Sequence, residues 1–102
     1  MMEKKYKLTK DTIQINEKTL YRIKSLRDFG NVKKGQLGGY IESEKNLSHF
    51  GNCWVYDNAC VFDSALVSSN AQIHCNAKVY DYALVLGNSY ISGNAHISLH
   101  YL

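Results

Sequence analysis

The residues best suited to acid–base chemistry are His74 and His96, which lie in a stretch with few ionisable side chains. A histidine acts as a general base when a neighbouring carboxylate orients its ring. Asp63 and Asp81 are candidate carboxylates, but their spacing places neither beside a histidine. A third histidine, His49, falls on an inward position of an irregular first repeat, where we expect a hydrogen-bonded capping residue. The spacing therefore predicts no catalytic residue.

Motifs for phosphate, nucleophile or metal chemistry are not found in the sequence. The glycine-rich segment 35–39 lacks the strand–turn–helix context of a phosphate-binding loop. The sequence has an odd number of cysteines, three, and they lack the spacing of metal ligands: Cys53, Cys60 and Cys75. This predicts free thiols in a reducing compartment. We expect no metal and no cofactor.

The elements that would position these residues follow from a six-residue repeat over residues 52–99. The fourth residue of each hexad is branched: Val55, Val61, Val67, Ile73, Val79, Val85, Ile91 and Ile97. The second is small: Cys53, Ala59, Ala65, Ala71, Ala77, Ala83, Ser89 and Ala95. This two-residue alternation is typical of strands, and a strict period of six excludes an amphipathic helix.

The hexads join at pairs such as Asp57-Asn58 and Gly87-Asn88, and Asn and Gly tolerate the left-handed backbone of a tight corner. Three strands then close a triangular coil, and successive coils stack by parallel pairing. We predict an all-β fold, a parallel β-helix of about three coils over residues 46–102. Its left-handed winding is implied by its resemblance to known hexapeptide-repeat solenoids, not by the spacing.

Residues eighteen apart share an outward face of this helix. Outward aromatic residues are typical of interface anchors and predict a binding surface formed by Trp54, Tyr56, Phe62, Tyr80 and Tyr90. Contiguous outward aliphatic residues mark a partner surface and predict a homodimer interface formed by Leu66, Leu84, Leu86, Tyr101 and Leu102. Alternatively, the N-terminal segment folds back over one face, which would explain one apolar face but not all three.

The N-terminal segment, residues 1–45, carries eleven Lys/Arg against six Asp/Glu, whereas residues 46–102 carry one against three. Apolar and polar residues alternate over 6–8, 12–15 and 19–23, which predicts a β-hairpin that caps the solenoid. Its basic residues are possible phosphate contacts: Arg22, Lys24, Arg27, Lys33 and Lys34. Scattered lysines also protect edge strands from aggregation, and we favour that interpretation.

Several strings, among them Leu37-Gly38-Gly39-Tyr40-Ile41 and the first hexad from Asn52, resemble small phage, prophage and bacterial hexapeptide-repeat proteins of the YdcK-like type, labelled hypothetical or putative transferases. The resemblance implies the β-helix and a phage or bacterial cytosolic setting, but no established catalytic residues. Similarity to hexapeptide-repeat acyltransferases would instead make His74 or His96 a base in a cleft between subunits. No long loop interrupts the repeats to build such a cleft.

We therefore expect a non-catalytic protein that binds a host protein or a nucleoprotein complex, as a phage-encoded inhibitor of host defence (an anti-CRISPR protein, for example) would. Two alternatives stay open: a structural or self-assembly module, and an acyltransferase-like enzyme. We also expect self-association as a homodimer. The sequence has no apolar run long enough for a bilayer and no signal peptide, which predicts a cytoplasmic protein in the bacterial cell without a membrane partner.

Overall fold

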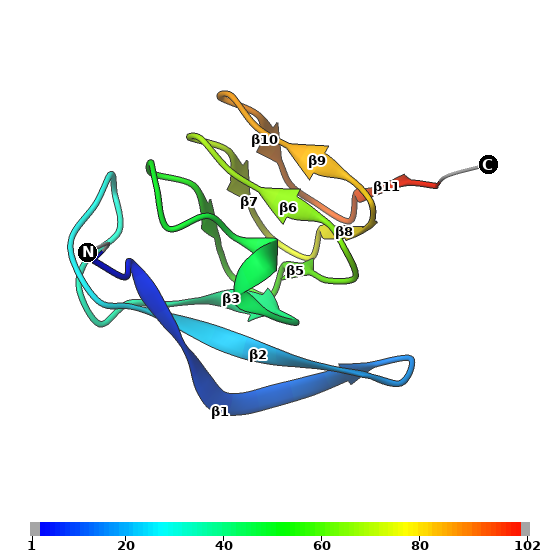
Figure 1. The fold of residues 1–102 in the computed structure, drawn as a ribbon, viewed down its shortest axis with the longest axis horizontal. Coiled ribbons are helices and arrows are strands. Elements are labelled where there is room, and N and C mark those ends of the chain that lie inside the picture. Colours follow the sequence, from blue (N-terminus) through cyan, green and yellow to red (C-terminus); the bar gives the residue numbers. More distant parts are fainter. Residues whose placement is uncertain (1–2, 101–102) are drawn as a thin grey trace.

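The computed structural model describes residues 3–100 and is built almost entirely of strands (Figure 1). The long strands of the N-terminal part are β1 (Tyr6–Ile15), β2 (Lys18–Ser25) and β3 (Leu37–Ile41), followed by a short 3-10 turn, η1 (Glu44–Asn46). The short strands of the repeats are β4 (Trp54–Val55), β5 (Cys60–Val61), β6 (Leu66–Val67), β7 (Gln72–Ile73), β8 (Lys78–Asp81), β9 (Leu84–Val85), β10 (Tyr90–Ile91) and β11 (His96–Leu99). Within residues 3–100, no helix has the length and apolar character needed to cross a membrane.

The short strands stack in parallel into three sheets that form the three sides of a solenoid. One side has the order β10-β7-β4, the second contains β5-β8-β11, and the third pairs β6 with β9. Trp54 lies opposite Gln72, and Gln72 opposite Tyr90, so the register advances eighteen residues per coil. We call these sides face one, face two and face three, in that order. The prediction of an all-β hexapeptide-repeat β-helix is confirmed.

The corners between strands repeat a left-handed backbone conformation every six residues. Positive φ angles occur at Gly51, Asp57, Asp63, Ser69, Cys75, Asp81, Gly87 and Gly93. Aspartate at a corner also binds the next coil, since Asp57 Oδ2 accepts a hydrogen bond from the Cys75 N–H at 2.9 Å. Asp63 Oδ2 accepts one from the Asp81 N–H at 3.0 Å. These carboxylates thus satisfy backbone donors that the corner leaves outside the strand ladder.

The branched and small columns of the repeat form the core. From Cys53 to Val85 every residue of both columns is buried, and Ala77 and Ile73 are fully inaccessible to solvent. In the last described coil, Ile91 and Ile97 are only partly covered. The core is therefore sealed at the N-terminal end and thins towards the C-terminal end.

The first coil departs from the eighteen-residue register. Ile41 of β3 pairs with Val61, and Leu47 pairs with Val67, so each partner lies twenty residues away. Leu47 is fully buried in the core position that the hexad pattern assigned to His49. The expectation that His49 points inward is therefore wrong. The first coil contains two residues more than a regular coil, so the inward position falls on Leu47.

The turn η1 forms the corner between Ile41 and Leu47, which share the twenty-residue offset, and the two additional residues follow it, between Leu47 and Trp54. The Asn46 side chain accepts hydrogen bonds from the Glu42 and Ser43 N–H groups and donates to the Ala65 carbonyl at 2.8 Å. Asn46 is fully buried, and its side-chain amide donates to a carbonyl of the next coil, where a backbone N–H would donate in a regular coil. The Asn46 side chain thus supplements the backbone hydrogen bonds from Tyr40, Glu42 and Ser48 that hold the first coil against the next.

The N-terminal hairpin extends the sheet of face two and then bends over that face. β1 and β2 form the predicted hairpin and pair antiparallel through a two-residue turn with Asn16 at φ 55°. A register shift between Leu8 and Thr12 accompanies the bend of β1 that Figure 1 shows at the bottom of the view. β2 pairs antiparallel with β3, whose other edge pairs parallel with β5. β3 therefore belongs to both the hairpin and the helix, and the division at residue 45 falls within one continuous structure.

Candidate functional site: an exposed ring ladder and a groove beside the hairpin

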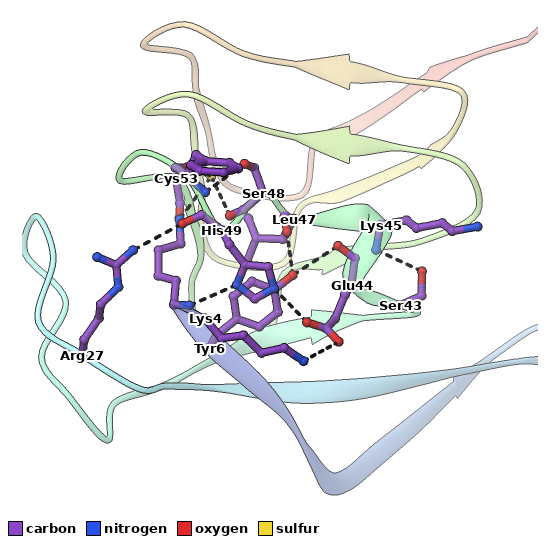
Figure 2. Close-up of polar contacts among 12 residues, drawn as sticks. Lys4, Tyr6, Arg27, Ser43, Glu44, Lys45, Leu47, Ser48, His49 and Cys53 are labelled. Carbon is purple, nitrogen blue, oxygen red and sulfur yellow. Dashed lines mark hydrogen bonds and ion pairs between the residues drawn. The ribbon is translucent and has the colours of Figure 1, made fainter. Parts of the chain in front are cut away.

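His49 lies at the junction between the hairpin and the helix, where both of its ring nitrogens have partners (Figure 2). The Lys5 N–H donates to Nδ1 at 3.0 Å, so Nδ1 carries no proton. Nε2 therefore holds the proton and donates it to Glu44 Oε1 at 2.8 Å. The ring also stacks on Tyr6, with centroids 4.1 Å apart. Neither nitrogen is available as a base, and the expected capping role fits this geometry.

Lys5 is fully buried beside His49, an unusual place for an ammonium group. Its Nζ donates to the Cys53 carbonyl at 2.7 Å and the Gly51 carbonyl at 3.2 Å, and lies 3.4 Å from Cys53 Sγ. The Phe29 ring lies 4.8 Å away and faces the same charge. Burial lowers the pKa of Lys5, and contact with Cys53 opposes that shift. The lysine, which directly precedes β1, thus joins the N-terminal segment to the first regular coil.

Trp54 was expected on an exposed binding surface, and this expectation is wrong. Its position in the repeat does face outward, but its side chain has no exposed surface. Phe29 and Tyr6 pack against the indole in T-shaped arrangements, at centroid distances of 5.2 and 6.2 Å. The N-terminal segment therefore folds over the first coil of face one and makes Trp54 part of the core.

Phe62 is a second predicted surface residue that the structure buries. It is 5% exposed and packs with Leu20, Tyr40 and Cys60 beneath the bent hairpin. Cys60 is buried for the same reason, and burial raises the pKa of its thiol. The alternative in which the N-terminal segment covers one face is thus correct for face two.

Three rings on face one remain stacked in a ladder that reaches the surface. Tyr56 and His74 lie 4.0 Å apart between centroids with 7° between their planes, and His74 and Tyr90 lie 4.7 Å apart. His74 is held by a 3.0 Å hydrogen bond between Nε2 and Gln72 Oε1. Exposure rises along the ladder, from half-buried Tyr56 to Tyr90 at 63%. We call these three residues the ring ladder.

A groove of about 430 Å³ runs between the hairpin tip and face two. Its lining includes Tyr80, which stacks on Phe62, and His96, whose Nδ1 is 3.5 Å from the Tyr80 hydroxyl. His100 Nε2 lies 3.1 Å from Asp81 Oδ2, within ion-pair distance but without hydrogen-bond alignment. The expectation that no histidine pairs with Asp81 is therefore wrong. The 18-residue register placed Leu99 opposite Asp81, and His100 follows it.

At the other side of the groove, Lys18 forms an ion pair with Asp63. Burial alone would raise the pKa of Asp63, but the hydrogen bonds from Lys18 and from the Asp81 backbone outweigh it, so this pKa is lowered. The same contact raises the pKa of Lys18. No sequence signal points to this pair, because it joins the hairpin tip to a corner of the helix. The groove is mixed in charge and presents no cluster of three metal ligands within residues 3–100.

The five predicted phosphate contacts divide into two groups. Arg22 donates to the Gly38 carbonyl at 2.7 Å, to the Tyr40 hydroxyl and to Asp11, and Arg27 donates to the His49 carbonyl at 3.3 Å. Both arginines therefore hold the hairpin on the helix, and their expected availability for phosphates is wrong. The remaining members are exposed or half-buried lysines: Lys24, Lys33 and Lys34.

The predicted dimer leucines lie together on face three, with Leu66 opposite Leu84. Leu84 and Leu86 are 60% and 47% exposed, while Leu66 is half-buried. Tyr101 and Leu102, which complete the predicted interface, lie outside the described residues.

Comparison with known proteins gives one partial similarity. A 38-residue stretch of the chain is 45% identical to a protein of Escherichia coli (strain K12) described as the uncharacterized acetyltransferase YdcK. The stretch is 37% of this chain and spans only 12% of that protein. No family model matches the sequence. The similarity and the solenoid together fit a hexapeptide-repeat protein.

Proposed function

We propose that this protein acts by binding another macromolecule, without turnover, through the ring ladder of face one. The observation that carries the proposal is the stacking of Tyr56, His74 and Tyr90 at centroid distances of 4.0 and 4.7 Å. Rings fixed by their neighbours lose little conformational entropy on binding, and aromatic anchors dominate the energy of protein interfaces. Backbone pairing holds the rings in place: Tyr56 and His74 directly follow β4 and β7 and donate their N–H groups to the carbonyls of Ile73 and Ile91, and Tyr90 lies in β10.

Within this class we favour a phage-encoded inhibitor of a host defence complex, comparable to an anti-CRISPR protein, working in the bacterial cytoplasm. The small size of the chain and its resemblance to phage and prophage proteins support this choice. The partner would be a protein surface, and if it carries nucleic acid, the lysines Lys24, Lys33 and Lys34 would add salt-sensitive attraction. A structural or assembly role is the alternative within the non-catalytic class.

The test uses the full chain as bait in a lysate of a bacterial host, followed by titration with the partner purified. Tyr56→Ala and Tyr90→Ala should each weaken the measured affinity about ten-fold or more, the effect of losing one aromatic anchor. Phe50→Ala is the matched control, because Phe50 is 70% exposed but lies outside the ladder. Equal losses in the control, or unchanged affinity in both ladder variants, would refute binding through face one. A steep salt dependence lost on Lys33→Glu would assign nucleic acid to the partner.

Acyl transfer is the second candidate, favoured by the partial similarity to a protein described as an acetyltransferase and by the His100–Asp81 contact of 3.1 Å. The two histidines first considered lack a carboxylate partner within the described residues: His74 contacts Gln72 and His96 contacts Tyr80. Release of CoA from acetyl-CoA, measured with and without candidate acceptors, tests this function. Turnover that His100→Ala or His96→Ala abolishes would replace the binding proposal with an enzyme.

A further inference from the structure

The last described coil leaves three strand edges without a neighbour. β9, β10 and β11 each pair on one side only, with β6, β7 and β8. Their opposite edges have no strand beside them within residues 3–100, and Figure 1 shows β9 and β10 at the end of the molecule away from the hairpin. Open strand edges are templates for pairing with another chain, and proteins usually protect them with charges, prolines or a covering element.

No such protection is found on this coil. No Lys, Arg, Asp or Glu occurs between Tyr82 and His100, and the whole chain contains no proline. Five of the eight exposed large apolar side chains of the described residues lie there: Tyr82, Leu84, Leu86, Tyr90 and Leu99. The core residue Ile97 is partly uncovered, whereas Val79, one coil earlier in the same column, is fully buried. The end of the helix therefore combines unpaired edges with an uncharged apolar cross-section.

The other end of the helix is mostly covered by the N-terminal segment and does not present three open strand edges. β3 is already paired by β2, and Trp54 of the first face-one strand is covered by Phe29 and Tyr6. A second copy thus has no place to stack head-to-tail, the arrangement that would extend into a filament. The outer edges of β1 and β4 are also unpaired within residues 3–100, but each is a single edge, whereas the C-terminal end presents three edges together.

We propose that the face formed by β9, β10 and β11 binds the same face of a second copy about a two-fold axis. A partner that covers it must present three strand edges at the corners of a triangle, and a second helix end does so. An uncharged surface also meets its own copy without like-charge repulsion, as an isologous contact requires. This interface differs from a side-by-side contact of face three, because it uses all three faces at their ends.

The experiment measures the mass of the full chain by light scattering and its dimer dissociation constant by sedimentation equilibrium. The wild type should give twice the monomer mass of 11.6 kDa at micromolar concentration. Leu99→Asp should raise the dissociation constant about 100-fold, because a two-fold contact contains the substitution twice and each copy contributes about ten-fold. Leu37→Asp is the matched control, since both leucines are 55% exposed and Leu37 lies at the capped end.

Leu66→Asp distinguishes the end contact from a side-by-side contact of face three. Leu66 lies on face three but one coil before the open edge, opposite Leu84. The end contact predicts that this variant stays dimeric while Leu99→Asp dissociates, with the fold of each variant confirmed by circular dichroism. A monomeric wild type at 100 micromolar, about the upper limit for a physiologically relevant contact, would overturn the proposal. So would dissociation by Leu66→Asp but not by Leu99→Asp, or a mass that grows continuously with concentration.

Discussion

Trp54 provides the sharpest test of how the N-terminal segment and the helix hold together. A residue on a free solenoid face could be changed to alanine at a cost of about 0.5 kcal/mol or less. Trp54 instead has no exposed surface and meets the rings of Phe29 and Tyr6. Replacing a buried tryptophan by alanine costs about 3–5 kcal/mol, through lost burial and the cavity left behind. In a domain of this size, each kcal/mol lowers the melting temperature by about 4–8 °C.

Trp54→Ala should therefore lower the melting temperature by at least about 12 °C, measured by circular dichroism at 218 nm, a wavelength of roughly maximal β-sheet signal. Trp54→Phe should cost less, because phenylalanine keeps a ring against both neighbours. It also removes the indole N–H, which has no hydrogen-bond partner within the described residues. Tyr90→Ala is the exposed aromatic control. If Trp54→Ala shifts the transition no more than this control does, the N-terminal segment does not dock as described.

Two further predictions concern packing and pH. A methyl group at Gly39 would lie 2.4 Å from the Ala59 carbonyl oxygen and 2.7 Å from Val55 Cγ1, so Gly39→Ala should destabilise by about 1–3 kcal/mol in urea unfolding. The hydrogen bond from His49 is the main cause of the lowered pKa of Glu44, whose folded value lies below the unfolded one. Its stabilising contribution is thus present above the ordinary carboxyl pKa and is lost as the pH falls through the folded value. Glu44→Gln should be less stable than the wild type at pH 7, and this difference should shrink in acid.

The regular part of the fold was predictable because the cross-section of the helix is small. Each inward position has room for one class of side chain, so the constraint repeats in the sequence with every turn. The corners repeat for an equally local reason, the positive φ angle that recurs from Gly51 to Gly93. The fold was therefore predictable from local constraints, because the position of a residue in its hexad decides which type of side chain fits there.

The burial of the candidate binding residues was not predictable in the same way. The repeat correctly placed Trp54 and Phe62 on outward positions, but whether an outward side chain is exposed depends on what docks over it. That docking joins segments about fifty residues apart, through contacts such as Lys5 with Cys53. The prediction for the first coil failed because its two additional residues, between Leu47 and Trp54, break the six-residue period, and only the pairing with the next coil reveals where they lie.

Face one thus has two roles, one in its first coil and one in its later coils. Its first coil anchors the N-terminal segment through Trp54, and its later coils leave a ring ladder that ends in Tyr90 at the open edge. The proposed dimer carries two ladders on one particle, so a partner with two matching sites would gain affinity from their proximity. The binding proposal and the dimer proposal then predict different effects of two substitutions. Tyr56→Ala should weaken partner binding and leave the dimer intact, whereas Leu99→Asp should dissociate the dimer and reduce binding only to the level of a single ladder. Because Tyr90 belongs to both surfaces, Tyr90→Ala should do both, and binding that is independent of Leu99→Asp would show that one ladder is sufficient.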